Sequence, residues 1–236
     1  MSQKSRVIIG GTSHIGFSIV NQLKSDQKAN TFVSYRNQDK FNEFYEHHDL
    51  TGIYIDFNEP FRMNTFDQME QINEVIICYG EEWFELFHEC NGKAIEQYIN
   101  AYITQFTIML TEFTRRMIQQ KSGKIILIGS IFGEVPASYE AIYSSVKAYQ
   151  HQLIKSLAKE LAPSNVQCSI IAPGVVTGGM TDRLDRETID VLKSDIPTGQ
   201  FVTAETIAEW VEFLLNQLDL SHTGQVISLN GGWHIQ

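Results

Sequence analysis

Short apolar runs alternate along the chain with longer stretches in which apolar residues recur every three or four positions. The runs that predict strands lie at 6–10, 31–34, 53–57, 75–80, 125–128, 166–172 and 225–229. Helical spacing follows the first run through Leu23, covers 94–120 and 141–162, and begins again after Thr203, a good N-cap residue. Strands that alternate with helices predict a doubly wound α/β fold, in which helices cover both faces of a mostly parallel seven-stranded sheet.

Length, charge and cysteine content narrow this picture. The 236 residues suffice for one α/β domain, which we expect to span residues 1–236. No apolar run approaches the roughly 20 residues of a membrane span, and the N-terminus is too polar for a secretory signal, so we expect a cytoplasmic protein. The net charge of -10 disfavours nucleic acid and anionic membranes as partners. Three cysteines without C-x-x-C spacing and scattered histidines predict no metal site.

The stretch with the clearest chemistry joins the strand at 125–128 to the helix at 141–162. Tyr143 and Lys147 are four residues apart on this helix, so their side chains share one face. Free tyrosine has a pKa near ~10, and a neighbouring ammonium group stabilises the phenolate. Ser130, just after the strand, can hydrogen-bond the same substrate oxygen that Tyr143 protonates. By itself, such a pair is more often a helix face with a solvated lysine.

A glycine-rich turn, Gly10-Gly11-Thr12-Ser13-His14-Ile15-Gly16, connects the first strand to its helix. Such a turn directs the backbone amides of a helix N-terminus at a pyrophosphate, and glycine allows close approach. The ligands expected from this turn are Gly10, Thr12, Ser13, His14, Ile15 and Gly16. The His14 side chain either turns outward, which we prefer slightly, or donates to a phosphate.

Arg36 follows the second predicted strand. In dinucleotide-binding folds an acidic residue about 20 positions beyond the glycines binds the ribose 2'-hydroxyl, whereas an arginine accommodates a 2'-phosphate. No acidic residue precedes Asp39 here, so the sequence favours NADP(H) over NAD(H). An ordinary surface arginine is the alternative interpretation.

Together, the glycine-rich turn, Ser130, Tyr143-x-x-x-Lys147 and Pro173-Gly174-Val175-Val176-Thr177 resemble the single-domain short-chain dehydrogenase/reductase family. The resemblance covers nearly the whole chain and implies a Rossmann-type domain. It is nearest to the 3-oxoacyl-carrier-protein reductases and similar reductases of small ketones. The chain departs from the family pattern at Ile9 and His14 in the turn, and at Ile77-Cys78-Tyr79 before Gly80.

The resemblance also implies roles for residues outside the turn. Asp56 would hydrogen-bond the adenine amine, with a turn cap as a nearly equal alternative, and Asn100 would hold a water in a proton relay behind Lys147 unless it is simply exposed. Besides the turn and Arg36, the implied cofactor-binding residues are Asp56, Phe57, Gly80, Tyr143, Lys147, Pro173, Gly174, Val175 and Thr177. The segment 178–199 would form a lid that determines the substrate.

The function implied by the resemblance is the NADPH-dependent reduction of a ketone to a secondary alcohol. Tyr143 would protonate the oxygen, Ser130 would orient it, and Lys147 would bind the ribose hydroxyls and lower the Tyr143 pKa. The substrate would be a small carbonyl compound, free or carrier-bound, and the protein a homodimer or homotetramer. Two alternatives stay open: a degenerate NADP(H)-binding sensor without catalysis, and an alcohol dehydrogenase that works in the oxidative direction.

Overall fold

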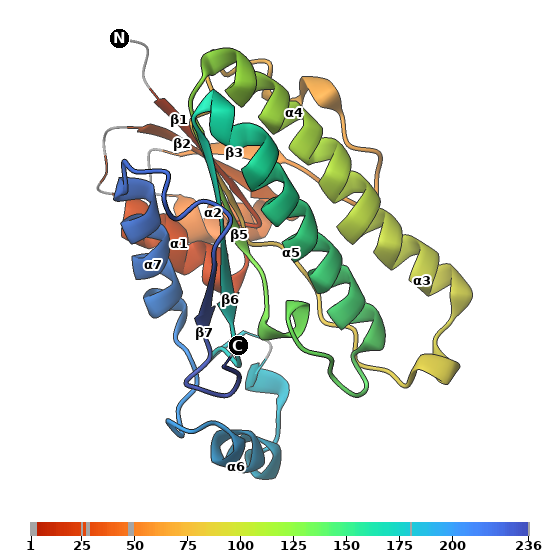
Figure 1. The fold of residues 1–236 in the computed structure, drawn as a ribbon. Helices are drawn as coiled ribbons and strands as arrows, with labels where there is room; N and C mark the ends of the chain where they lie inside the picture. The colour runs from red at the N-terminus through yellow and green to blue at the C-terminus, as the bar shows by residue number, and fades with distance from the viewer. Residues whose placement is uncertain (1–3, 25, 27–28, 47–49, 180, 236) are drawn as a thin grey trace.

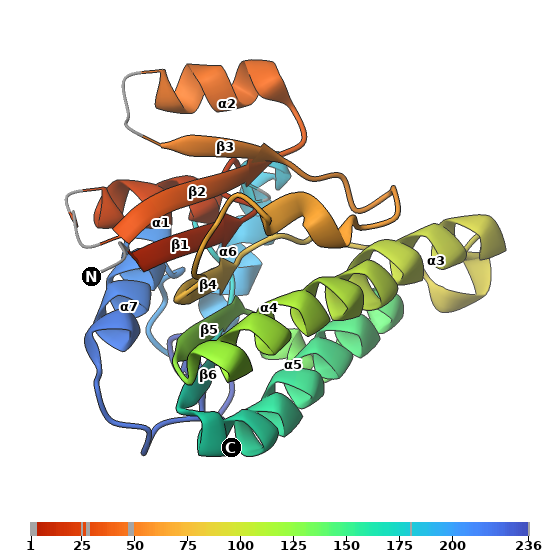
Figure 2. The same cartoon turned by 90° about the horizontal axis from the view of Figure 1, so that it is seen from above.

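The computed structural model describes residues 4–24, 26, 29–46, 50–179 and 181–235. Its centre is a parallel sheet of seven strands in the order β3-β2-β1-β4-β5-β6-β7, and Figure 2 shows the strands from β3 to β6 in this order. The strands are β1 (Lys4–Ile9), β2 (Ala29–Tyr35), β3 (Thr51–Tyr54), β4 (Glu74–Ile77), β5 (Gly123–Ile128), β6 (Val166–Pro173) and β7 (Val226–Leu229). The predicted doubly wound fold is confirmed, and its strand order reverses beside β1, where such folds bind ligands.

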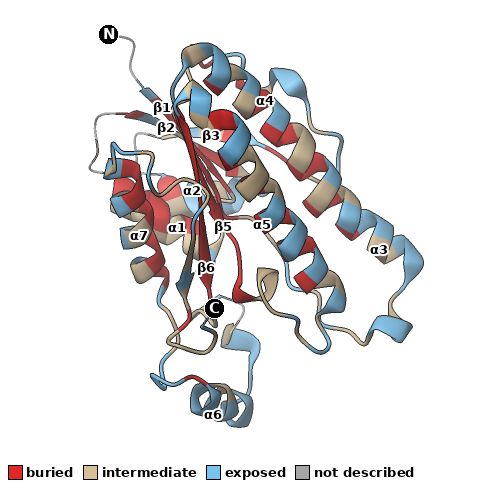
Figure 3. Ribbon diagram, in the orientation of Figure 1, coloured by how far each residue is buried: buried red, intermediate tan, exposed pale blue. Residues whose placement is uncertain are grey.

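Two layers of helices cover the sheet (Figure 1). One face carries α1 (His14–Leu23), α2 (Gln38–Tyr45) and α7 (Ala204–Asn216), and the other carries α3 (Gly92–Ile99), α4 (Phe106–Gln120) and α5 (Ala141–Leu161). Successive residues of β1 alternate between the layers: Val7 and Ile9 pack with α4 and α5, whereas Ile8 packs with α1 and α7. Burial on both faces explains why the central strands read as continuous apolar runs. Figure 3 shows these strands as buried and the outer helix faces as exposed.

The helix predicted over 94–120 is interrupted. A π-helical turn, Asn100–Gln105, separates α3 from α4. The Gln105 amide donates to Asn100 Oδ1 at 3.0 Å, a spacing of five residues that fits the wider π turn. Gln105 Oε1 also accepts the Phe61 backbone amide at 2.7 Å, so tertiary contacts hold the turn in place.

The remaining segments refine the predicted boundaries. The third strand ends at Tyr54, earlier than expected, so Asp56 and Phe57 lie in the following loop. The predicted lid contains α6 (Arg186–Asp195), which lies apart from both helix layers at the lower end of the molecule in Figure 1. Met180, within that segment, lies outside the described residues. Short 3-10 turns occupy Met63–Phe66, Phe87–Glu89, Ile131–Gly133, Ala162–Ser164 and Thr181–Arg183.

A buried ion-pair network connects β1, β4 and the segment after α1 at the amino end of the sheet. The Arg6 guanidinium donates to Glu74 of β4 at 2.7 Å and to Asp26, beyond α1, at 2.8 Å. Arg6 is 1% exposed, so these carboxylates compensate a charge removed from water. Among the helices in the described ranges, none combines the length and the apolar character that crossing a membrane requires.

Candidate active site

The carboxyl ends of β4, β5 and β6 and the first turns of α5 meet at one end of the sheet (Figure 1). Ser130 follows β5 in an extended conformation, and its hydroxyl oxygen accepts the Phe132 amide at 3.2 Å. This bond caps the short Ile131–Gly133 turn. The serine is buried and held at the point where the chain leaves the sheet.

Tyr143 and Lys147 lie on the first turns of α5, facing the end of β5. The Lys147 ammonium nitrogen is 5.7 Å from the centre of the Tyr143 ring, and the Ser130 hydroxyl lies near enough to the Tyr143 phenol to oppose the rise of its pKa. The fold thus brings together three of the residues selected from the sequence. Gly80, after β4, borders the same space, since a Cβ atom there would lie 3.2 Å from Lys147 Nζ.

Burial controls the proton affinities of this group. It raises the pKa of Tyr143 to about 12, a rise that the Ser130 hydroxyl partly opposes and that Glu140 and Glu82 increase. Burial also lowers the pKa of Lys147 to about 8. The Tyr143 pKa therefore lies above that of free tyrosine and not below it as expected, because loss of water around the phenol outweighs the effects that stabilise the phenolate.

The glycine-rich turn has the geometry of a tight strand-to-helix connection. Ser13 caps α1: its hydroxyl accepts the Gly16 amide at 3.1 Å and donates to the Gly10 carbonyl at 2.7 Å. Gly10 has a φ of +81°, and a Cβ atom at Gly16 would lie only 2.2 Å from the Gly10 carbonyl oxygen. Thr12, His14 and Ile15 complete the turn. The first backbone amides of α1 have no hydrogen-bond partners within the helix and point away from its N-terminus.

His14 does more than turn outward. Its side chain is exposed, and its Nε2 donates to the Thr177 carbonyl, 2.9 Å away and 163 residues later in the chain. The ring lies against Gly178 and Gly179, where Cβ atoms would come within 2.6 Å and 3.4 Å of ring atoms. His14 therefore connects the glycine-rich turn to the loop after β6.

The other predicted cofactor residues lie around the same end of the sheet. Arg36, after β2, forms an exposed ion pair with Glu81 at 3.3 Å. Asp56 accepts the backbone and side-chain amides of Asn58, both at 2.9 Å, so it occupies the turn-capping position that was its alternative interpretation. The Phe57 ring stacks on Tyr79 at 4.1 Å and contributes to the core.

Asn100 begins the π-helical turn. Its side-chain oxygen accepts from Gln105, and within the described ranges it makes no direct hydrogen bond to Lys147. The asparagine is half-buried in a continuous helical stretch, so it is not simply exposed, and its role in a relay stays a prediction. The π turn belongs to the same helix that flanks α5, so a water-mediated link to Lys147 is a proposal and not an observed contact.

The segment Pro173-Gly174-Val175-Val176-Thr177 leaves β6 toward the lid. Val175 accepts the Val202 amide at 2.9 Å, and the Thr177 amide donates to the Val202 carbonyl at 2.8 Å. Beyond it lies a cavity of about 510 Å³ between the loop and α6. Its lining includes Thr177, Gly178, Thr181, Leu184, Ile189, Lys193 and Phe201. The predicted lid thus adjoins the segment that is expected to bind the cofactor.

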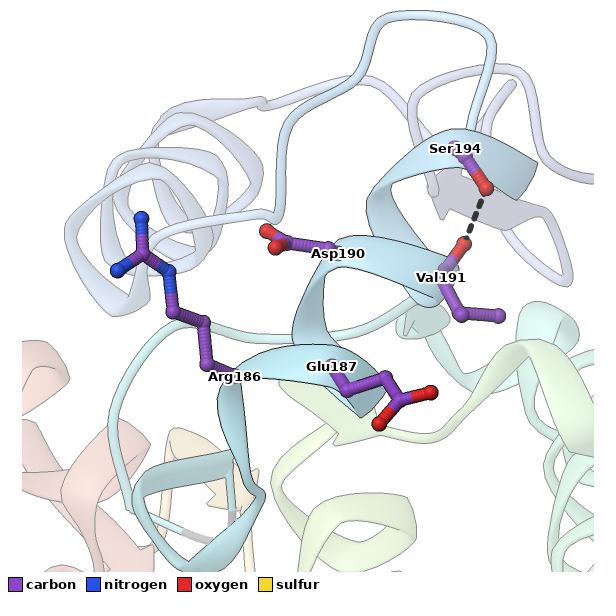
Figure 4. Close-up of a pocket in the computed structure, with 5 residues that line it drawn as sticks. All are labelled: Arg186, Glu187, Asp190, Val191 and Ser194. Carbon is purple, nitrogen blue, oxygen red and sulfur yellow. Dashed lines mark hydrogen bonds between the residues drawn. The ribbon is translucent and has the colours of Figure 1, made fainter.

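A second, open pocket lies on α6 itself. Figure 4 shows its lining: Arg186, Glu187, Asp190, Val191 and Ser194. All five come from one helix, and the Ser194 hydroxyl donates to the Val191 carbonyl at 2.7 Å. None belongs to the group around Tyr143, so this pocket supplies no chemistry to the site.

Aromatic side chains form an edge of the site near the start of α5. The Phe84 and Tyr139 rings stack at 5.0 Å, and the Glu85 amide donates to the Tyr139 carbonyl at 2.7 Å. Trp83 packs against Tyr98 instead. The segment after β4 therefore lies beside the start of α5, the helix that carries Tyr143 and Lys147.

Two titratable residues near Tyr143 were not selected from the sequence. Burial and the neighbouring Glu82 raise the pKa of Glu140 to about 7. His151 is buried two turns after Tyr143 on α5, beside Ser130. Glu140 lies three residues before Tyr143 and His151 eight residues after it, and this spacing can be read from the sequence. Their pKa shifts arise from burial, which has no local signal in the sequence.

Comparison with known proteins identifies the family. A family model described as short chain dehydrogenase matches residues 4–188, which include the glycine-rich turn, Ser130, Tyr143 and Lys147. The chain belongs to the short-chain dehydrogenase family. It is accordingly an oxidoreductase, as the resemblance in the sequence implied.

Relatives of this short-chain dehydrogenase include reductases. It is 32% identical over 166 residues to the uncharacterized oxidoreductase YmfI of Bacillus subtilis (strain 168), covering 70% of this chain and 69% of that protein. It is 26% identical over 242 aligned positions to the 3-oxoacyl-(acyl-carrier-protein) reductase FabG of Buchnera aphidicola subsp. Baizongia pistaciae (strain Bp), covering 99% and 98%.

Solved structures share the fold of this short-chain dehydrogenase. The structure described as ElxO with NADP bound has a TM-score of 0.87 at 20% identity, covering 98% of this chain and 99% of that one. The crystal structure of gox2181 has a TM-score of 0.88 at 20% identity, covering 99% and 96%. At this identity the likeness shows the fold alone.

Proposed function

We propose that this short-chain dehydrogenase reduces a ketone to a secondary alcohol with NADPH. The observation that carries the proposal is the convergence of Ser130, Tyr143 and Lys147 at the carboxyl end of the sheet. A hydroxyl, a phenol and an ammonium group gathered there can orient a carbonyl oxygen and deliver a proton to it. The relatives named as 3-oxoacyl reductases favour a 3-oxoacyl compound, free or carrier-bound, as the substrate class.

The chain's residues fit a dinucleotide. The N-terminus of α1 beyond the glycine-rich turn offers amides and a positive dipole end to a pyrophosphate. The absent side chain of Gly80 leaves room in front of Lys147 Nζ, where ribose hydroxyls can be bound. Besides these, the proposed cofactor ligands are Arg36, Asp56, Phe57, Pro173, Gly174, Val175 and Thr177.

Arg36 accounts for the proposed preference for NADPH. Its ion pair with Glu81 is exposed on both sides, and such pairs contribute only about 0–1 kcal/mol. A 2'-phosphate, which accepts two parallel hydrogen bonds from a guanidinium group, can therefore replace Glu81 as its partner. The exchange would leave the glutamate in water, where its charge is well solvated.

In the proposed mechanism the bound cofactor supplies the hydride to the carbonyl carbon. Tyr143 keeps its proton at neutral pH because burial raises its pKa to about 12, so it presents a neutral hydroxyl as the acid. Ser130 holds the substrate oxygen in line with that hydroxyl. Lys147, with a pKa lowered to about 8, is still mostly protonated near neutrality and stabilises the phenolate left after proton transfer. Asn100 supports the relay that returns the proton to Tyr143.

One observation favours the alternative of a sensor that binds NADP(H) without turnover. The His14 ring joins the glycine-rich turn to the Thr177 carbonyl, at the place where a pyrophosphate would approach α1. If this contact persists in solution, it restricts the entry of the cofactor. Cofactor binding must therefore be measured before turnover.

The test is a fluorescence titration with NADPH and NADH of the wild type and of Arg36→Ala. We expect the wild type to bind NADPH more tightly, and Arg36→Ala to lose about tenfold in NADPH affinity with little change for NADH, because only NADPH carries the phosphate. Arg115→Ala is the control, since the exposed Arg115 also pairs with a glutamate, Glu112, but does so on α4, away from the proposed cofactor site.

Turnover is measured next, as consumption of NADPH with 3-oxoacyl thioesters and simple ketones. Reduction of any of these supports the proposal. Failure to bind either cofactor would overturn it. NADPH binding without turnover, and no difference between the wild type and Tyr143→Phe, would support the sensor instead.

A further inference from the structure

A buried histidine lies directly behind Ser130. His151 is 1% exposed and follows Tyr143 and Lys147 on the same face of α5, at successive intervals of four residues. Its Nε2 lies 3.3 Å from the backbone nitrogen of Ser130 and accepts that amide's hydrogen bond. The histidine touches the serine's backbone while the serine's hydroxyl faces Tyr143.

Two glycines admit the ring. A Cβ atom at Gly129 would lie 2.0 Å from His151 Nε2, and one at Gly133 would lie 2.7 Å from the ring. These glycines are just before Ser130 and three residues after it. The loop that carries Ser130 therefore contacts the imidazole from both sides. Any side chain at Gly129 or Gly133 would collide with the ring.

The contact requires a neutral ring with a free electron pair on Nε2, because the Ser130 amide is the donor. Burial, with the charges of Lys147 and Lys155, lowers the pKa of His151 to about 3 and keeps the ring neutral. The proton then resides on Nδ1, which is buried and has no hydrogen-bond partner among the described residues. An aliphatic side chain would fill the same core space without that desolvation cost, so packing alone does not account for a histidine here.

We propose that His151 is a positioning residue for Ser130: by accepting the Ser130 backbone amide, it fixes the loop in the conformation that places the serine hydroxyl beside Tyr143. Without the imidazole, the amide would be a buried donor lacking a partner, and the loop would move to satisfy it. The inference rests on the proposed reductase function, in which Ser130 orients the substrate oxygen.

A double-mutant cycle tests this role, with kcat and KM measured for a ketone that the wild type reduces. We expect His151→Leu to lower kcat by about 10- to 100-fold with KM within about twofold, because the hydroxyl matters most in the transition state. In the Ser130→Ala background the same substitution should cost less than about twofold, since the group it positions is gone. His151→Gln, which retains an acceptor oxygen, should recover part of the loss.

Ile154→Ala is the control for stability. It removes packing from a fully buried position on α5 without touching the Ser130 loop, so its kcat per folded molecule should match that of the wild type. Circular dichroism and NADPH titration establish the folded fraction of each variant. If His151→Leu does not fold, the cycle is completed with His151→Met.

The outcomes separate the two proposals. No effect of Ser130→Ala on turnover would overturn the proposed role of Ser130 and, with it, the reductase mechanism. A large effect of Ser130→Ala together with an unchanged kcat in His151→Leu would overturn the positioning role alone. An undiminished loss in the Ser130→Ala background would likewise show that His151 acts on something other than Ser130.

Discussion

At the scale of single residues, burial determines what the site can do. Tyr143 and Lys147 are shifted in opposite directions, the phenol toward holding its proton and the ammonium toward losing it. Both pKa shifts favour the uncharged form of the group, because a charge is poorly hydrated in this buried space. A bound substrate that removes more water will increase both pKa shifts. Proton transfer from Tyr143 therefore depends on the negative charge that develops on the carbonyl oxygen of the substrate.

Removal of the Tyr143 hydroxyl should abolish this transfer. We expect Tyr143→Phe to lower kcat by about a thousandfold while NADPH affinity changes less than about twofold, because the ring and its packing remain. Steady-state kinetics and cofactor titration check both quantities. Tyr149→Phe is the control, since its hydroxyl bonds Thr107 at 2.8 Å on the outer side of α5. Equal activity of the two variants would contradict the assignment.

His151 should make the protein sensitive to acid. Its pKa falls from 6.5 to about 3 on folding, so below pH 6.5 the unfolded chain takes up a proton that the folded protein does not. The free energy of unfolding therefore decreases as the pH falls from 6.5 toward 3, by about 2 kcal/mol at about pH 5. In denaturant unfolding, the free energy of unfolding of His151→Leu should fall less than that of the wild type between neutral pH and about pH 5, by this amount. The same loss in both proteins would contradict the prediction.

At the scale of elements, α5 and the glycine-rich turn carry the site. Tyr143, Lys147 and His151 lie on one face of α5, so the position of this single helix aligns an acid, a cation and the support of Ser130. The neighbouring helix is interrupted by a π turn at Asn100. Such turns redirect a side chain without ending the helix, and they are frequent at functional sites.

The turn before α1 should not tolerate a side chain. A Cβ atom at Gly16 would meet the Gly10 carbonyl oxygen at 2.2 Å and the Gly11 Cα at 2.7 Å, and backbone atoms cannot rotate away as a side chain can. We expect Gly16→Ala to lower the free energy of unfolding by at least about 2 kcal/mol and to abolish NADPH binding. Denaturant unfolding and cofactor titration measure these effects.

Gly92→Ala is the matched control for that substitution. Gly92 begins α3 and has no atom within 4 Å of its would-be Cβ. Since alanine has the higher helix propensity, this variant should be unchanged or more stable by up to about 1 kcal/mol. A comparable loss in both variants would show that the turn is less constrained than its contacts indicate.

At the scale of the whole molecule, the two ends of the sheet have different tasks. The carboxyl end gathers the site from segments between Gly10 and Thr177, whereas the amino end contains the Arg6, Glu74 and Asp26 network. The sheet separates them, so stability and catalysis should respond to different substitutions. The homodimer or homotetramer and the cytoplasmic location expected from the sequence stay predictions.

Glu74→Gln should therefore destabilise the protein without changing its chemistry. Removing one carboxylate leaves the Arg6 charge buried with reduced compensation, which we expect to cost about 3 kcal/mol. Asp67→Asn, in an exposed pair with Arg116, should cost less than about 1 kcal/mol. Urea unfolding and kcat per folded molecule separate the effects. A large fall in kcat for Glu74→Gln would contradict the separation of the two ends.

Local patterns in the sequence suffice to predict the fold and to select the candidate residues at the centre of the site. All seven strands and four helical patterns were predicted, because apolar periodicity is a local signal that burial on a sheet or helix face imposes. The spacing of Tyr143 and Lys147 fixes their common face for the same reason. Boundaries were less accurate, as at Tyr54 and Asn100, because loops and π turns depend on partners elsewhere in the chain.

The electrostatics and the long-range contacts of the site depend on the tertiary structure. The direction of the Tyr143 pKa shift depends on how much water the fold removes, which the order of residues does not state. The contacts of His14 with Thr177, Arg36 with Glu81 and His151 with Ser130 join segments whose meeting depends on how strands and helices pack. The spacing of residues along a helix specifies which side chains share a face, but the residues that this face contacts depend on tertiary packing.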